Sequence, residues 1–308
     1  GYSLLGASGA TTFSALWVIG VTCFCKATFC SPGTVPQSFK EKFANAQAEA
    51  SATHQTSLVS EKPVDVQCVP TTGGSKNTGT DVRQKELEAL KNGFIVCSRC
   101  DEPRPPRSHH CKHCKKCVLK MDHHCPIVNN CIGHKNHKFF ILTILYCFVG
   151  CFEAFLIGMV WLFAAGLPVL SRFEKIFLIL GASLGTSYTI ATGLFGAFHV
   201  WMAFNNLTTL EVFAVGIRAA LHSGKFEPIF DVGWKQNFQQ VFGTNPWLWF
   251  LPVYSSQGDG CSFPIDPAKA IRNPSIMNGE SIFTSIQTFI DESPLIPQTR
   301  HRHTVVDV

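Results

Sequence analysis

The chain has 308 residues, and only 15% of them are Asp, Glu, Lys or Arg, whereas soluble proteins average about 25%. This low charge, with 26 phenylalanines and apolar residues gathered in blocks, indicates a membrane protein and argues against a single soluble domain. The net charge of +5 is mild and suits an anionic ligand or a membrane surface, and we expect no nucleic-acid partner. The 14 cysteines lack the paired framework of a secreted disulfide protein, which predicts a reducing compartment.

The first apolar block runs from about Ala10 to Phe29, within residues 1–30, and has no charge before Lys26. About 20 apolar residues cross a bilayer as a helix, so we expect a membrane span. A cleaved signal peptide is the alternative, but no basic residues precede the block and no clear small-residue cleavage site is present. Because the chain begins with Gly1 and not Met, we expect that it lacks its natural N-terminus.

Residues 31–92 are expected to form a cytosolic linker that is largely flexible, because Ala, Ser, Thr, Gln, Lys and Gly dominate it from Pro36 to Thr80. Within the linker we expect marginal helix from Gln37 to Ala50. A short helix is expected from Asp81 to Leu90, where Asp81 is a suitable N-cap.

The next segment, residues 93–138, is dense in metal ligands: between positions 97 and 131 it holds seven of the 14 cysteines and five of the 12 histidines. Ligand pairs separated by two residues wrap an ion in a tight turn, and alternating His and Cys favour tetrahedral zinc over an iron–sulfur cluster. Because the segment has few large apolar residues, we expect short strand pairs that zinc stabilises by roughly 10–16 kcal/mol per site. The candidate ligands are Cys97, Cys100, His109, His110, Cys111, Cys114, Cys117, His123, His124, Cys125 and Cys131.

Two tetrahedral ions need eight ligands, so at least one candidate is left over. A leftover cysteine among cations and histidines has a lowered pKa and is a good nucleophile. Cys125 is the strongest candidate, because His123 lies two residues before it and Asp122 is available to orient the imidazole. The residues alone leave a catalytic and a purely structural interpretation of Cys125 open.

Two more apolar blocks follow, from Phe139 to about Leu170 and from about Ile176 to Phe204, and the polar piece 171–175 is expected to join them. Each is predicted to be a membrane helix, because a lone strand in lipid leaves its backbone unpaired. Glu153 is the only acidic or basic residue in these blocks, and we expect its carboxylate to face the bundle interior and to bond a neighbour.

The basic residues predict the orientation of these spans. Lys and Arg gather in residues 31–138 and again after Phe204, so both regions are predicted to lie in the cytosol. We expect residues 205–265 to form a C-terminal cytosolic region. Residues 266–308 are expected to be a disordered tail that mixes Pro, Ser, Thr and Arg.

The ligand spacing strongly resembles that of the Asp-His-His-Cys (DHHC) protein S-acyltransferases, or palmitoyltransferases. The resemblance covers about Ala10 to Phe263. The matching run is Cys97-x2-Cys100-x9-His110-Cys111-x2-Cys114-x2-Cys117-x4-Asp122-His123-His124-Cys125-Pro126-x4-Cys131, followed by Asn136 and Phe140. Further along, Thr208-Thr209-Leu210-Glu211 is similar to the family's Thr-Thr-x-Glu motif, and Asn237 to Gly243 with Ser255 to Gly260 is similar to its C-terminal region.

The resemblance implies a role for each matching residue. Cys125 would be the nucleophile, His123 its general base, and Asp122 the group that orients His123. Two structural zinc ions are implied, one held by Cys97, Cys100, His110 and Cys117, the other by Cys111, Cys114, His124 and Cys131. In the motif Thr208-Thr209-Leu210-Glu211, Thr209 would contact the Asp122 region, and Glu211 and Asn237 would brace the C-terminal segment.

The implied reaction is a two-step transfer of a palmitoyl group from acyl-CoA to cysteines of membrane-associated proteins, through an acyl-enzyme on Cys125. The acyl tail would lie among the spans, and Arg104, Arg107 and His109 would meet the CoA phosphates and adenine. For these three residues a solvated cationic face is the alternative. The resemblance favours a multi-pass protein of the Golgi or endoplasmic reticulum, with the plasma membrane as an alternative, and it leaves the oligomeric state open.

The chain departs from the family pattern at two points. Ile127 stands where many relatives have an aromatic residue, and one span precedes the cluster where the family usually has two. We therefore expect four spans in the intact protein, and Gly150 in the second apolar block to favour longer acyl chains.

Two other functions compete with the enzyme. A membrane-anchored zinc adaptor without chemistry would use Cys125 as a ligand. A zinc transporter is disfavoured, because the spans offer only Glu153 and His199 to line an ion path.

Overall fold

The structure is a computed structural model that describes residues 2–45, 95–97, 99–165, 171–213 and 228–272. It divides into two compact units. The first unit contains Gly1–Val35, Arg107–Thr208 and Asp231–Cys261, and the second contains Pro36–Pro106, Thr209–Phe230 and Ser262–Val308. The predicted helix from Asp81 to Leu90, the linker after residue 45 and the tail after residue 272 lie outside the described residues.

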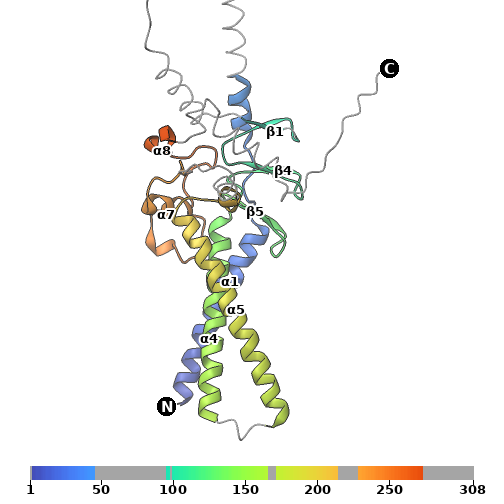
Figure 1. The fold of residues 1–308 in the computed structure, drawn as a ribbon, viewed down its shortest axis with the longest axis vertical. Helices are drawn as coiled ribbons and strands as arrows, with labels where there is room; N and C mark the ends of the chain where they lie inside the picture. The colour runs from blue at the N-terminus through green and yellow to red at the C-terminus, as the bar shows by residue number, and fades with distance from the viewer. Residues whose placement is uncertain (1, 46–94, 98, 166–170, 214–227, 273–308) are drawn as a thin grey trace, which may run out of the picture. The chain divides into compact units, whose positions relative to one another are not determined.

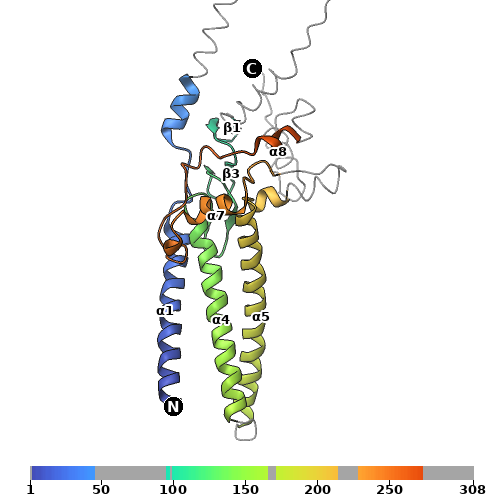
Figure 2. The same cartoon turned by 90° about the vertical axis from the view of Figure 1, so that its left-hand side faces the viewer.

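Three long helices form the apolar part of the first unit: α1 (Tyr2–Phe29), α4 (His137–Ala165) and α5 (Arg172–Phe204). Helix α4 packs against both α1 and α5, and the three lie side by side in Figure 2. Each helix contains a stretch long and apolar enough to cross a membrane, namely Thr11–Phe29, His137–Val160 and Arg172–Phe204. The three predicted spans are therefore present as candidate membrane helices within the described residues.

Helix α5 begins earlier than predicted. We expected residues 171–175 to be a polar connection, but Arg172 already starts the helix. Ser171 is its N-cap: the Ser171 side chain accepts from the Glu174 backbone N–H at 3.3 Å, and Glu174 Oε2 accepts from the Ser171 N–H at 2.7 Å. This capping box satisfies N–H groups that the first turn of a helix leaves without partners. The helix therefore begins within the polar residues, before the start of the apolar block from which we predicted it.

Glu153 on α4 has the neighbour that the sequence predicts. Thr12 Oγ1 on α1 donates a hydrogen bond to Glu153 Oε1 at 3.2 Å. A carboxylate within an apolar helix needs such a partner, and here the partner also links α4 to α1.

The predicted short strand pairs are present as three antiparallel hairpins. They are β1 (Ile95–Cys97) with β2 (Glu102–Arg104), β3 (His109–Cys111) with β4 (Lys116–Val118), and β5 (His123–Cys125) with β6 (Asn130–Ile132). The residue before each second strand has a positive φ: Asp101 at 53°, Lys115 at 52° and Asn129 at 46°. A left-handed residue at this point is typical of short hairpin turns, so the three hairpins share one turn geometry.

Two asparagines attach the β5–β6 region to the end of α1. Asn130 Nδ2 donates to the carbonyls of Ala27, Thr28 and Cys30, and Asn136 Nδ2 donates to those of Ala27 and Cys131. The last carbonyls of a helix have no partner within it. The asparagines supply these partners and hold the cysteine-rich segment at the end of α1.

The predicted linker 31–92 is more ordered at its start than expected. The Gly33 carbonyl accepts from the Leu119 N–H at 3.0 Å, and the Pro32 carbonyl accepts from the Lys135 N–H at 3.0 Å. Residues 37–45 form a helix, as expected for the first part of Gln37 to Ala50. The hydrogen bonds to the cysteine-rich segment order the first residues of the linker, which their composition did not predict.

The C-terminal region adds helix α7 (Trp234–Phe242), the 3-10 helix η2 (Pro246–Leu248) and α8 (Pro267–Arg272). Helix α8 lies within residues 266–308, where we had expected disorder. In the first unit, Lys138 Nζ donates to the carbonyls of Leu248 and Val253 and to Ser255 Oγ, at 2.7, 3.0 and 2.8 Å. This buried ammonium thus connects the start of α4 to the loop after α7.

Candidate active site and metal centre

The three predicted catalytic residues lie together at the start of β5. Asp122 is fully buried, and its backbone N–H donates to the Ile132 carbonyl at 2.8 Å, which places its side chain beside the hairpin. His123 Nδ1 lies 2.6 Å from Asp122 Oδ2. Because Nδ1–H donates to the carboxylate, Nε2 is left as the proton acceptor of the ring. Cys125, also buried, follows two residues later on the same strand.

The surroundings of His123 favour its charged form. Burial lowers the pKa of His123, but the hydrogen bond to Asp122 and the negative charge of Asp122 raise it, as does the hydrogen bond with Cys125. The net effect is a pKa above the usual value. An imidazole that holds a proton readily beside a thiol is suited to take the proton of that thiol.

Four other ligand residues form a group of donors. The Nδ1 atom of His124 lies 3.6 Å from Cys111 Sγ, 3.5 Å from Cys114 Sγ and 3.6 Å from Cys131 Sγ. Zinc–sulfur and zinc–nitrogen bonds of about 2.3 and 2.0 Å in a tetrahedron separate N and S ligands by about 3.5 Å. The donor set of these residues therefore fits a zinc ion, and Cys125 is not part of it.

The hairpins explain how this group assembles. His124 lies directly opposite Cys131 in the β5–β6 register, whereas Cys111 and Cys114 flank the β3–β4 turn, where the Cys114 N–H donates to Cys111 Sγ at 3.3 Å. Burial and the neighbouring thiols of Cys111 and Cys114 raise the pKa of Cys131. The Cys131 thiol therefore keeps its proton until a cation replaces it, so metal binding would release that proton.

The other predicted ligand set is divided between the units. His110 and Cys117 face each other across β3 and β4, in the same arrangement as His124 and Cys131. Cys97 ends β1 and Cys100 lies in the following turn, within the second unit. A zinc ion shared by these four residues stays a prediction.

Sequence reasoning missed the role of Asn206. Arg107 donates from Nη1 to Asn206 Oδ1 at 3.0 Å and from Nη2 to the Asn206 carbonyl at 2.8 Å, and Lys120 Nζ donates to the same Oδ1 at 2.9 Å. Asn206 Nδ2 donates in turn to Gln240 Oε1 on α7 at 3.1 Å. This buried residue therefore joins the cysteine-rich segment to the end of α5 and to α7.

The residues predicted to contact CoA are less exposed than a solvated cationic face would be. Arg104, Arg107 and His109 are all buried, and the Arg107 guanidinium already bonds Asn206. Their contact with CoA stays a prediction. Thr208 and Glu211 are buried as well, and Thr209 begins a helix, of which residues 209–213 are described.

Asn237 on α7 bonds the end of α5 and the segment before α7, and its predicted bracing role stays a prediction. Its Nδ2 donates to the Phe204 carbonyl at 2.8 Å and to Asp231 Oδ1 at 2.6 Å, and its Oδ1 accepts from the Val232 N–H at 3.1 Å. Since the side chain is fully buried, no water replaces these bonds when the amide is removed.

Replacing Asn237 by alanine is expected to lower the free energy of unfolding by about 3 kcal/mol, because each buried group left unpaired costs about 1–3 kcal/mol. Thermal unfolding of the protein in detergent measures the effect. Gln239→Ala is the control, because it also removes an amide side chain from α7 but leaves the bonds of Asn237 in place. An Asn237→Ala variant as stable as the parent would show that the bracing bonds contribute nothing.

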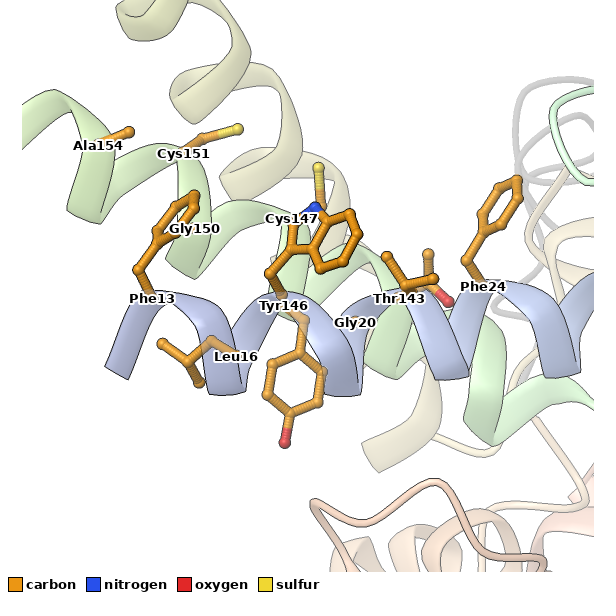
Figure 3. Close-up of a pocket in the computed structure, with 12 residues that line it drawn as sticks. Phe13, Leu16, Gly20, Phe24, Thr143, Tyr146, Cys147, Gly150, Cys151 and Ala154 are labelled. Atoms are coloured by element: carbon orange, nitrogen blue, oxygen red, sulfur yellow. The ribbon is translucent and has the colours of Figure 1, made fainter. Parts of the chain in front are cut away.

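An apolar cavity of about 410 Å³ lies between α1 and α4. Phe13 and Phe24 line it from α1, and Gly150 and Ala154 from α4 (Figure 3). A Cβ atom added at Gly150 would meet no heavy atom within 4 Å. The space next to Gly150 is therefore open.

Comparison with known proteins agrees with the geometry. Residues 91–214 match the family described as DHHC palmitoyltransferase. The chain is 39% identical to palmitoyltransferase ZDHHC2 of Danio rerio over 62% of its own length and 55% of the relative's. It is 40% identical to ZDHHC2 of Mus musculus over 57% of its length and 47% of the relative's, and 38% identical to ZDHHC15 of Rattus norvegicus over 61% and 56%. The chain thus spans about half the length of these curated relatives, and the match to the DHHC palmitoyltransferase family covers its residues 91–214.

Proposed function

We propose that this protein is a protein S-acyltransferase that moves a long-chain acyl group, such as palmitoyl, from acyl-CoA to cysteines of membrane-associated proteins. The observation that carries the proposal is that the two adjacent histidines of β5 have different partners. His124 belongs to the group of zinc-ligating donors, whereas His123 bonds Asp122 and adjoins the one buried thiol of the hairpin outside that group. Metal binding alone does not require an oriented imidazole beside a thiol that is not a metal ligand.

In the first step, His123 Nε2 takes the proton of the Cys125 thiol, and the thiolate attacks the thioester carbonyl of acyl-CoA. The bond between the carbonyl carbon and the CoA sulfur breaks, and the CoA thiolate takes the proton from His123. In the second step, His123 takes the proton of a substrate cysteine, whose thiolate attacks the acyl group. Cys125 leaves as a thiolate and regains the proton from His123. Throughout, Asp122 holds the imidazole and stabilises its positive charge.

Two structural zinc ions are part of the proposal. Cys111, Cys114, His124 and Cys131 would hold one, and Cys97, Cys100, His110 and Cys117 the other. When bound, the ions would supply folding free energy to hairpins that lack an apolar core of their own.

The apolar cavity between α1 and α4 is our candidate for the acyl tail, where burial contributes about 0.8 kcal/mol per CH₂. Its apolar lining from two membrane helices supports this assignment. Arg104, Arg107 and His109 would meet CoA, and Thr208, Thr209 and Glu211 would support the site next to Asp122. The distribution of Lys and Arg supports a cytosolic site on an integral membrane protein. The organelle that we propose is the Golgi or the endoplasmic reticulum, with the plasma membrane as the alternative.

Incubation of the purified protein with labelled palmitoyl-CoA is expected to leave about one label per chain that hydroxylamine removes, because a thioester is cleaved by hydroxylamine. The label should then move to a membrane-anchored peptide that contains cysteine. Label that resists hydroxylamine, or no label on a protein with its full zinc content, would favour a zinc adaptor without chemistry.

A further inference from the structure

Two histidines of the membrane helices converge on the catalytic carboxylate. His137 on α4 has its Nε2 4.0 Å from Asp122 Oδ1, the oxygen that does not bond His123. His199 on α5 completes the group: one ring nitrogen of each histidine and one Asp122 oxygen all lie within 4.8 Å of one another. All three side chains are at least 98% buried.

The ring nitrogens of these histidines need polar partners. Three of these nitrogens have no hydrogen-bond partner within the described part of the chain. They are Nδ1 and Nε2 of His137 and Nδ1 of His199. Buried polar atoms are almost always paired, by protein groups or by ordered water. Separations of 4.0 to 4.8 Å are too long for direct hydrogen bonds but suit groups that share one bridging water. A buried water typically makes about three bonds to such groups.

Packing alone does not explain a histidine at position 199. Its ring makes edge contacts with Phe140, Phe195 and Phe198, with centroids 5.0, 4.6 and 5.8 Å away. A phenylalanine would suit these aromatic neighbours and would bury no polar nitrogen. The polar group that His199 can serve is the Asp122 carboxylate.

We propose that His199 is a positioning residue for the acylation reaction. Together with His137 it holds Asp122 Oδ1 through a shared water, while Oδ2 of the same carboxylate holds His123 Nδ1. Fixing both oxygens fixes the plane of the carboxylate and therefore the direction in which His123 points. The orientation of the general base then depends on α5 as well as on the β5–β6 hairpin. This inference rests on the proposed function.

The test compares apolar and polar replacements of His199 in the full chain, purified in detergent. His199→Phe keeps the ring and removes the polar atoms, and His199→Gln keeps a donor and an acceptor. We expect His199→Phe to slow acyl-enzyme formation about tenfold, since a misplaced supporting group costs up to about a hundredfold, and His199→Gln to stay within about threefold of the parent. Phe195→Leu changes the packing on His199 without touching a polar group, and should stay within about twofold.

A second measurement follows Cys125 without acyl-CoA: the rate of its alkylation by iodoacetamide, quantified by peptide mass spectrometry. His199→Phe should slow this reaction and His199→Gln should not, even if no acyl transfer is ever detected. Failure of the proposed function is thereby separated from failure of this inference. His199→Met, apolar and unbranched, is measured alongside in case the phenylalanine variant does not fold.

Three outcomes would overturn the proposal. Equal rates for the phenylalanine, methionine and glutamine variants would show that His199 serves packing only. A glutamine variant as slow as the phenylalanine variant would show that a neutral polar partner is not what Asp122 needs. Loss of a third bound zinc ion in the His199 variants would show that Asp122, His137 and His199 hold a metal ion instead of a water.

Discussion

Cys125→Ser is expected to abolish the hydroxylamine-sensitive label from palmitoyl-CoA, with a loss of at least about a thousandfold in the rate of acyl-enzyme formation. The serine hydroxyl is a far weaker nucleophile than the thiolate, and removal of a nucleophile costs a triad enzyme as much as removal of the whole triad. Zinc content should stay at two per chain, because the four donors around His124 do not include Cys125. Label incorporation and metal analysis on the same sample check both parts.

Cys261→Ser is the matched control for this experiment. Cys261 is buried as Cys125 is, but it belongs to neither donor group. Its replacement should leave label and zinc unchanged. If Cys125→Ser were labelled at the parent rate, the nucleophile would be another cysteine, and if its zinc content fell, Cys125 would be a ligand as the adaptor hypothesis requires.

Cys131→Ser is expected to have the largest effect on stability. Cys131 is fully buried and lies opposite His124 in the β5–β6 register. Its loss should release one of two zinc ions, and with it roughly 10–16 kcal/mol of binding free energy that holds the hairpins together. Since that is as large as the whole stability of a typical domain, about 5–15 kcal/mol, the hairpins should unfold. Metal analysis and protease digestion of the cysteine-rich segment measure the result.

Cys125 and Cys131 thus form an internal comparison, because they lie on the two strands of one hairpin. The first substitution should remove the label and keep both zinc ions, and the second should remove the label and one zinc ion. A Cys131→Ser variant that retains two zinc ions and resists protease as the parent does would refute the assignment of Cys131 as a ligand.

The sequence predicted the membrane helices and hairpins well because both depend on local properties. An apolar run of about 20 residues has few options other than a membrane helix, and all three spans are present. Ligands spaced by two residues similarly require a tight turn. The start of α5 was predicted wrongly because the bonds between Ser171 and Glu174 override the polar composition of the first turn.

The parts of the site that the sequence did not predict are contacts between distant segments. Arg107 and Asn206 are 99 residues apart, and no pattern in either segment indicates that they bond. His199 was noticed only as an ionisable residue within a span. The burial of a polar side chain in an apolar helix was the available signal, but only the packing of α4 and α5 shows that its neighbour is Asp122.

By itself, the sequence determined the chemistry that is available: three apolar helices, a dense set of zinc ligands, and Cys125 with His123 and Asp122 beside it. These follow from composition and short spacings, which local geometry converts directly into structure. Only the tertiary structure decided which oxygen of Asp122 holds His123, and which residues of α4, α5 and α7 surround the site. Those contacts depend on how helices and hairpins pack, and packing is determined by the whole chain and not by any one segment of it.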